Sequence, residues 1–80
     1  MNLKQLEAFV CVADKKSFSK AARELYLTQP TISAHIASLE KELDARLFIR
    51  NTKEVSLSED GTVLYSYAKQ MIDLEEQIEA

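Results

Sequence analysis

Near the start of the chain, apolar residues recur at intervals of three and four. Asn2 precedes this pattern and Gln5 follows Asn2 by three residues, which is the spacing of a capping box at a helix start. The periodic pattern fades at about Lys15, where a polar break over residues 14–17 begins. The apolar positions are Leu3, Leu6, Phe9, Val10 and Ala13. The pattern predicts a first helix that ends near Lys15.

Two further helices follow, separated by a brief turn at Tyr26–Leu27. Ser17 caps the first of them, which is only two turns long and carries small residues where another helix could approach closely. Thr28 caps the other. Pro30 fits the first turn of this helix because the N–H groups there have no partner within the helix, so the missing N–H of proline costs nothing. Its apolar face is formed by Ile32, Ile36, Leu39 and Leu43. This third helix is predicted to run to about Leu43.

The remainder of the chain predicts a hairpin and a long helix. Two short apolar segments, Leu47–Arg50 and Glu54–Leu57, are separated by three polar residues and indicate paired strands with a basic tip. Ser58 caps the last helix, in which apolar residues step by three and four over about two heptads. This stripe comprises Leu64, Tyr67, Met71, Leu74 and Ile78. We expect its first half to pack on its own domain and its second half, from Met71 onward, to pair with a second copy.

The order of these elements indicates a mainly α fold with a small β-hairpin. A two-turn helix, a tight turn and a capped longer helix form the pattern of a helix-turn-helix, in which the second helix enters the DNA major groove. The hairpin beside it is expected to form a wing. The fold prediction is therefore a winged helix-turn-helix over residues 1–57, followed by a linker and dimerisation helix over residues 58–80.

Composition narrows the class of protein. Eighty residues form one small domain, and a single Gly and a single Pro argue against an all-β fold with many turns. No apolar run is long enough to span a bilayer, and no signal peptide is evident, so we expect no membrane association. The one cysteine, Cys11, suits a reducing compartment. These features predict a cytoplasmic helical domain.

The net charge of −3 is unevenly distributed. Residues 1–57 carry nine basic and seven acidic side chains, whereas residues 58–80 carry one basic and six acidic side chains. A basic body with an acidic tail is expected when one face of a protein meets a polyanion. The charge pattern therefore allows nucleic-acid binding despite the acidic overall balance.

The face of the third helix opposite its apolar side is small and rich in hydroxyl groups. Around the helical wheel, Thr31, Ala34 and Ser38 lie on this face, and bulky side chains there would hold the helix away from a groove floor. Thr28 and its neighbours could equally be an ordinary helix start. We interpret the face as a candidate DNA-reading surface.

The ordered series of residues resembles the N-terminal DNA-binding region of LysR-type transcriptional regulators over residues 1 to about 65. The resemblance rests on Leu3, Gln5, Leu6, Phe9, Val12, Ala13, Ser17, Phe18, Ala21, Ala22, Leu25, Gln29, Pro30, Ser33, Ile36, Leu39, Glu40, Leu43, Arg46, Leu47, Phe48, Arg50, Leu57 and Gly61. It implies that Gln29, Pro30 and Ser33 lie in or beside the groove and that the last helix mediates dimerisation. The resemblance also implies an effector-binding domain. We expect that domain to be absent from this chain, which would then be a fragment.

Three positions depart from the family pattern. Ala34 stands where the family often has arginine, so contact with a thymine methyl is expected in place of a guanidinium. Asp44 stands where the family commonly has a helix-ending glycine. Lys53 stands where arginine is frequent, which keeps the charge and loses the bidentate geometry.

The wing and the second helix supply candidate phosphate contacts. On the wing these are Arg50, Thr52 and Lys53, although charges on a hairpin can also protect an edge strand from aggregation. Near the second helix they are Ser17, Ser19 and Lys20, although capping explains the serines equally well.

No pattern in the sequence supports an enzyme, a cofactor or a metal site. One histidine, His35, and one cysteine cannot complete a metal site, and Cys11 is expected to lie in or near the core. The leading functional prediction is sequence-specific binding of double-stranded DNA by a homodimer. The alternative is a helical module for protein interaction that does not touch DNA.

Overall fold

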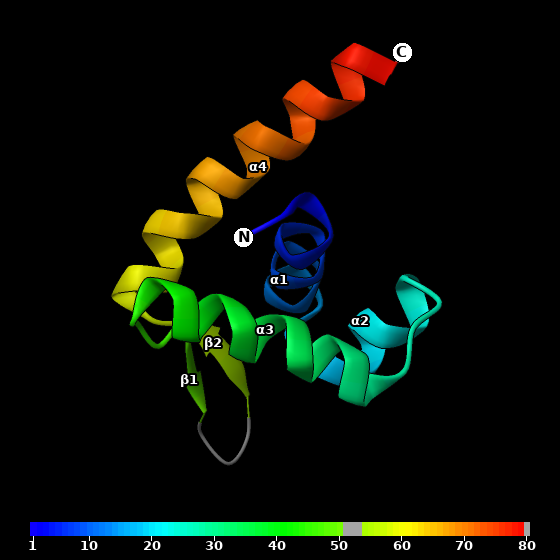
Figure 1. Cartoon of the computed structure of the whole chain (residues 1–80). Helices are drawn as coiled ribbons and strands as arrows, with labels where there is room; N and C mark the ends of the chain where they lie inside the picture. Colours follow the sequence, from blue (N-terminus) through cyan, green and yellow to red (C-terminus); the bar gives the residue numbers. More distant parts are fainter. Residues whose placement is uncertain (51–53, 80) are drawn as a thin grey trace.

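The computed structural model describes residues 1–50 and 54–79, with only the backbone described at Arg50. Four helices and a two-stranded hairpin follow the predicted order (Figure 1). The elements are α1 (Leu3–Lys15), α2 (Phe18–Glu24), α3 (Gln29–Leu43), β1 (Phe48–Arg50), β2 (Val55–Leu57) and α4 (Glu59–Glu79). The predicted fold class, a mainly helical winged helix-turn-helix with a long C-terminal helix, is confirmed.

The helix starts occur where capping side chains stand in the sequence. Gln5 N donates to Asn2 Oδ1 at 2.8 Å and Asn2 N donates to Gln5 Oε1 at 3.2 Å, which confirms the capping box of α1. Ser17 accepts from Lys20 N at 3.1 Å, and Thr28 accepts from Thr31 N at 3.3 Å. Ser58 Oγ accepts from Gly61 N at 2.9 Å at the start of α4. Local hydrogen bonds therefore fix all four starts.

The hairpin is shorter than predicted. Residues 48–50 of β1 pair antiparallel with residues 55–57 of β2, with Ile49 opposite Ser56. Leu47 and Glu54 lie outside the strands, so the predicted strands were each one residue too long. Leu47 N donates to the carboxylate of Glu40 at 2.9 Å, so this N–H serves to anchor the segment on α3 instead of extending the ladder.

The core lies where α1, α3 and the base of the hairpin meet. In Figure 1, α1 passes behind α3, with α2 at one end of α3 and the hairpin below the other. The Phe48 ring of β1 packs against Phe9 of α1 and Phe18 of α2, with ring centres 5.4 and 5.9 Å apart. Ala21 and Ala22 are buried, as expected for a close helix approach. The fully buried larger side chains are Leu6, Phe9, Val12, Ile32, Ile36, Leu39 and Leu47.

Helix α4 begins against the hairpin base and then crosses α1. A Cβ at Gly61 would lie 2.0 Å from the Leu47 carbonyl oxygen, so only glycine permits this close approach. Ala68 is buried, and Leu64 and Ile72 are among the α4 side chains that pack against the core. In Figure 1 the C-terminal half of α4 extends beyond the rest of the molecule.

The expected packing of the apolar residues predicted along the last helix, which start with Leu64 and Tyr67, is partly wrong. Leu64 is half-buried against the core, but Tyr67, also expected to pack on its own domain, is 61% exposed. Residues 64, 68 and 72 follow each other by about one helical turn and face the core. Tyr67 then lies about 100° around the helix from the centre of that face, beside Val63, which is 60% exposed. None of the helices in the described ranges is both long and apolar enough to cross a bilayer.

Candidate nucleic-acid interface

The turn between α2 and α3 sets the relation of the two helices. Tyr26 adopts a left-handed conformation with φ 57°, and the following Leu27 N donates to the Ala22 carbonyl at 2.9 Å. This is the geometry of a Schellman helix end, which reverses the chain within one residue. Thr28 then starts α3 immediately afterwards. The predicted tight turn of a helix-turn-helix is confirmed, with a tyrosine at the left-handed position.

Helix α3 ends in the same way. Asp44 has φ 50°, and Ala45 N donates to the Glu40 carbonyl at 3.1 Å. Asp44 therefore occupies a left-handed helix cap, a position that favours glycine. An aspartate tolerates this conformation better than most residues but at a higher cost than glycine.

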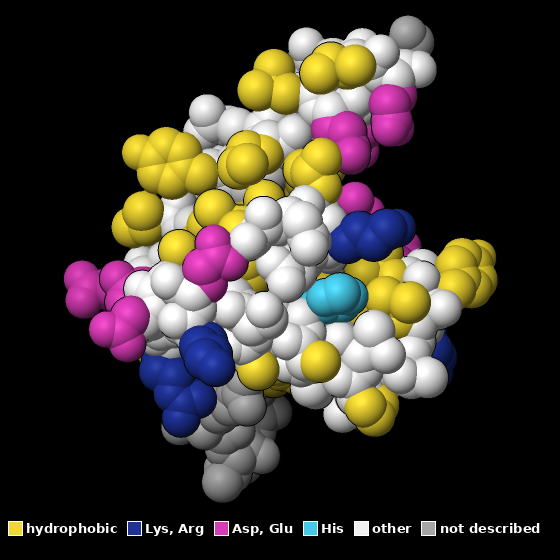
Figure 2. Space-filling model, in the orientation of Figure 1, with side chains coloured by type: hydrophobic (Ala, Val, Ile, Leu, Met, Phe, Trp, Pro, Cys, Tyr) yellow, Lys and Arg dark blue, Asp and Glu magenta, His cyan; other side chains and the backbone are white. Residues whose placement is uncertain are grey.

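The outward face of α3 brings together the predicted DNA-reading residues. Thr28, Gln29, Pro30, Thr31, Ser33, Ala34 and Ser38 are all exposed, and Ile32, Ile36 and Leu39 on the opposite face are fully buried. Figure 2 views this face, on which uncharged side chains predominate and basic side chains gather toward the hairpin end. The Thr28 and Thr31 hydroxyl oxygens lie 2.8 Å apart and close the first turn of α3.

Ser38, a member of this set, is hydrogen-bonded to a residue of another helix. The Ser38 hydroxyl accepts a hydrogen bond from Gln5 Nε2 at 3.2 Å. Since Gln5 Oε1 also accepts from Asn2 N, the same side chain caps α1 and reaches α3. The sequence pattern identified Gln5 only as a capping residue. A capping box uses only the amide oxygen of glutamine, so the free amide nitrogen was the feature that could have indicated a second partner.

The residues near α2 that were predicted to contact DNA phosphates differ in their surroundings. Ser17 is used as the N-cap, and its hydroxyl lies 3.1 Å from that of Ser19, so capping accounts for Ser17. Lys20 is exposed and lines a shallow hollow with Lys15, Arg23 and Glu24. Arg23, which sequence reasoning did not single out, therefore joins two lysines beside α2, with one carboxylate among them.

The predicted contacts of the wing lie mostly outside the described residues. The Arg50 backbone is in β1, opposite Val55. Thr52 and Lys53 fall outside the described ranges. Phe48 holds the base of the wing on α1 and α2, and the hydrogen bond from Leu47 N to Glu40 ties it to the C-terminal end of α3.

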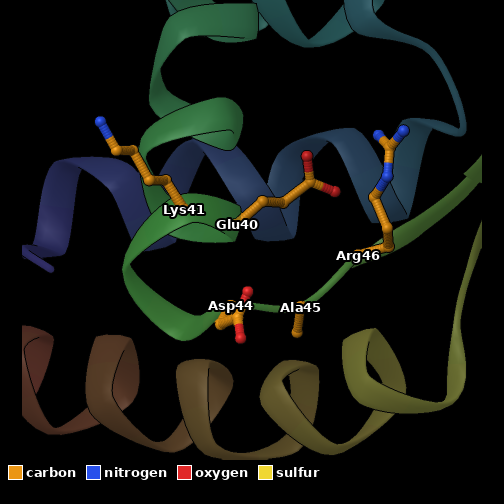
Figure 3. Close-up of a pocket in the computed structure, with 5 residues that line it drawn as sticks. All are labelled: Glu40, Lys41, Asp44, Ala45 and Arg46. Atoms are coloured by element: carbon orange, nitrogen blue, oxygen red, sulfur yellow. The ribbon is translucent and has the colours of Figure 1, made fainter.

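A hollow at the end of α3 holds side chains of both charges. Figure 3 shows Glu40 directed toward the side of Arg46, while Lys41 points away from both. The Glu40 carboxylate accepts from Leu47 N, so it ties α3 to the start of the hairpin. We therefore interpret the hollow as a structural junction between α3 and the hairpin. Lys41 is exposed at its edge.

Cys11 and His35 lie at the edge of the core, as predicted for Cys11. Cys11 Sγ lies 4.0 Å from the Ala21 carbonyl oxygen, and burial, followed by the nearby Glu24 carboxylate, raises the pKa of the thiol above 9.0. His35 is half-buried and lines a hollow with Leu25 and Leu27. Within residues 1–50 and 54–79, no three His, Cys, Asp or Glu side chains are grouped to hold a metal ion.

The outward side of α4 carries a continuous row of exposed apolar side chains, here named the α4 stripe. Its members are Val63, Tyr67, Met71, Leu74 and Ile78, with exposed fractions between 42% and 84%. Figure 2 shows hydrophobic side chains along the upper part of the molecule, where α4 runs. Such a row on an 80-residue chain is typical of a surface that meets another polypeptide.

Known proteins share both the sequence and this geometry. The family model for bacterial regulatory helix-turn-helix proteins of the lysR family matches residues 3–62. The chain is 47% identical over 72 residues to an uncharacterised HTH-type transcriptional regulator, YxjO, of Bacillus subtilis, and 43% identical over 75 residues to the regulator CysL of the same organism. These alignments cover 90% and 94% of this chain and 25% of each relative, so the chain spans about a quarter of their length.

Solved structures agree in the arrangement of all elements. A complex of BenM DBD with catB site 1 DNA has a TM-score of 0.93 at 36% identity, over 98% of this chain and 87% of that chain. A complex of CbnR DBD with DNA has a TM-score of 0.90 at 27% identity, over 96% of this chain and 88% of that chain. The family model, the identities and these structures agree with the helix-turn-helix geometry described above, and the chain belongs to the LysR family of bacterial regulatory helix-turn-helix proteins.

Proposed function

We propose that this chain binds double-stranded DNA sequence-specifically and does so as a homodimer. The observation that carries the proposal is the outward face of α3, which is exposed, small and rich in hydroxyl groups from Thr28 to Ser38. Solvated helix faces are ordinarily rich in long charged side chains. A face of small residues lets the helix axis approach the floor of a major groove. The solved DNA complexes of BenM DBD and CbnR DBD support the proposal, since both share this fold.

In this proposal, the first half of α3 reads base edges. Gln29 and Ser33 offer hydrogen-bonding groups, while Ala34 offers a methyl group that suits a thymine methyl. Pro30 and Thr31 line the same exposed turn. The Ser38 hydroxyl ties α3 to α1 through its hydrogen bond from Gln5. It contacts a base only when a base replaces Gln5 as its partner.

Phosphate contacts then set the position of the domain on the duplex. The exposed N-terminus of α3 at Thr28 favours a phosphate through its N–H groups and the helix dipole. Lys20, with Arg23 beside it, supplies charge from α2. Arg50, Thr52 and Lys53 supply wing contacts to the neighbouring backbone. Because Ala34 has no long side chain to read a base edge, we expect specificity to depend strongly on DNA shape and deformability.

The homodimer forms through the α4 stripe. Burial of Met71, Leu74 and Ile78 against the same residues of a second copy would remove apolar side chains that are 42%, 58% and 84% exposed in the single chain. Two-fold symmetry would then place two α3 helices on half-sites about one helical turn apart, roughly 34–36 Å.

The biological role follows from the family. The relatives are transcriptional regulators, and we infer that this chain acts in transcription regulation in the cytoplasm, without a catalytic activity of its own. The full-length relatives are about four times as long, and the signal to which such a regulator responds would enter through an effector-binding domain beyond the residues of this chain.

In vitro selection from random duplex DNA, at near-physiological salt, tests the proposal. A pseudo-palindromic consensus with half-sites about one turn apart is the expected result. Salt-sensitive binding without sequence enrichment would contradict sequence-specific recognition. Absence of binding would favour the alternative function, a protein-interaction module, for which the exposed α4 stripe is the supporting observation.

A further inference from the structure

The direction in which α4 leaves the domain is fixed by few directional contacts. At its start, Ser58 Oγ donates to the Arg46 carbonyl at 2.5 Å and Ser58 N donates to the Leu47 carbonyl at 3.0 Å. Gly61 lies against Leu47 in the same place. These contacts hold one point of the helix. By themselves they do not set the direction of the helix.

A second point is held by one hydrogen bond to α1. Tyr65 Oη donates to Asp14 Oδ1 at 2.6 Å, a short bond to a charged acceptor. Asp14 lies in the last turn of α1, two residues before the left-handed Lys16 that ends the helix. The helix therefore fixes the backbone of Asp14. The hydrogen bond from Tyr65 to Asp14, followed by partial burial, raises the pKa of the phenol above 10.0, so Tyr65 keeps its donor proton at neutral pH.

The remaining contacts between α4 and the core are apolar. Leu64, Ala68 and Ile72 pack on the core, and the hydrophobic effect that drives this packing is non-directional, unlike a hydrogen bond. Beyond Ile72 the helix continues to Glu79 (Figure 1). This part carries Leu74 and Ile78 of the α4 stripe, which are 58% and 84% exposed. Any pivot of α4 therefore moves the proposed dimer surface relative to α3.

We propose that the Tyr65–Asp14 pair is a positioning device that sets the angle between the helix-turn-helix and α4, and thereby selects the spacing of two DNA half-sites. This inference rests on the proposed function. From Gly61 to Tyr65 the helix rises about 6 Å, and from Gly61 to Ile78 about 25 Å. A displacement of 1 Å at Tyr65 would thus become about 4 Å at Ile78, which exceeds the rise of about 3.4 Å per base pair along DNA.

The first test measures spacing preference on DNA. Duplexes carry two copies of the selected half-site, and their centre-to-centre distance is changed by single base pairs around about 10 base pairs. We expect the wild-type chain to prefer one spacing by about fivefold or more, and Tyr65→Phe and Asp14→Ala to reduce this ratio to about twofold or less. The double variant should match either single variant, because both remove the same bond. Affinity for a single half-site should stay unchanged.

Tyr26→Phe is the matched control, since Tyr26 is 95% exposed in the turn and lies far along the chain from α4. It removes one phenolic hydroxyl and should leave the spacing ratio at the wild-type value. A Tyr65→Phe chain that keeps the wild-type ratio, even with a lowered melting temperature, would overturn the proposal, because a purely stabilising role changes stability and leaves spacing untouched.

The second test needs no DNA. Spin labels at Ala37→Cys on α3 and Gln77→Cys on α4, in a Cys11→Ser background, report the distance between the two helices within one chain when the labelled chain is diluted with unlabelled chain. A narrow distribution that broadens or shifts in Tyr65→Phe and Asp14→Ala supports the positioning role. An unchanged distribution overturns it. If selection finds no DNA consensus, the proposed function fails, and the distance distribution still decides whether the pair holds α4.

Discussion

Gln5 of α1 donates a hydrogen bond from its amide nitrogen to the Ser38 hydroxyl of α3, 3.2 Å away, while its amide oxygen caps its own helix. One side chain thereby joins the start of α1 to the outward face of the proposed recognition helix. The contact lies at the exposed rim of the α1–α3 packing, whose interior is formed by Leu6, Phe9 and Ile36. Gln5 therefore couples helix capping to the placement of α3.

Replacement of Gln5 tests this double role. Gln5→Ala removes the capping-box partner and the bond to Ser38, so we expect the free energy of unfolding to fall by about 1–2 kcal/mol. Denaturant unfolding of the two chains measures the change. Gln77→Ala, at an exposed position of α4, is the matched control and should change stability by less than about 0.5 kcal/mol. Equal losses in the two variants would show that Gln5 adds nothing beyond an ordinary surface residue.

The left-handed cap of α3 predicts a stabilising change. Asp44 has φ 50°, a conformation that costs a residue with a Cβ more than it costs glycine. Asp44→Gly should raise the free energy of unfolding by about 0.5–1 kcal/mol. Ala37→Gly, within α3, should instead lower it by about 1 kcal/mol. Thermal unfolding of both variants distinguishes the cap from a general effect of glycine, and destabilisation by Asp44→Gly would contradict the expectation.

Base reading and phosphate contact predict different responses to substitution. Ser33→Ala should relax the base preference at one position of the half-site, by about 1–3 kcal/mol, with a smaller effect on total affinity. Lys53→Ala should weaken binding to every sequence and reduce the slope of log affinity against log salt by about 1. Titrations on consensus and single-mismatch duplexes at several salt concentrations separate the two. Equal loss on all sequences with Ser33→Ala would remove Ser33 from the base-reading set.

The α4 stripe predicts the oligomeric state. Leu74 is 58% exposed in the single chain, and a charge introduced there would be buried without a partner in a dimer. Leu74→Glu should raise the dimer dissociation constant by at least about tenfold. Sedimentation velocity over a range of concentrations measures this shift. Gln77→Glu introduces the same charge on an exposed position of α4 and should leave the dimer intact. Dimerisation of Leu74→Glu with wild-type affinity would assign the interface to another surface.

Cys11 predicts a pH dependence of stability. Burial, and then the Glu24 carboxylate, raises the pKa of its thiol in the folded chain above 9.0. A group with a raised folded pKa contributes stability fully below its unfolded pKa, and this contribution is lost as pH rises from 9.0 through the folded pKa. Stability of the wild type should therefore fall more steeply above pH 9.0 than that of Cys11→Ala. Parallel slopes for the two chains would contradict the assignment.

Local patterns in the sequence were sufficient to predict the order of elements and most of their limits. Asn2, Ser17, Thr28 and Ser58 each bond an N–H within three residues, so these helix starts depend on short-range chemistry alone. Each strand of the hairpin was predicted one residue too long. For the first strand the reason is that Leu47 N bonds to Glu40 of α3, seven residues earlier in the chain. Periodicity along one segment carries no information about such a bond.

The sequence by itself determined the helix-turn-helix, the exposed polar face of α3 and the apolar content of α4. It could do so because capping and helical periodicity are properties of neighbouring residues. Only the tertiary structure decided which α4 residues face outward, since the close approach of Gly61 to Leu47 and the bond from Tyr65 to Asp14 rotate Leu64 inward and Tyr67 outward. Contacts between different elements, and not any local preference, fix the rotation of a helix about its axis.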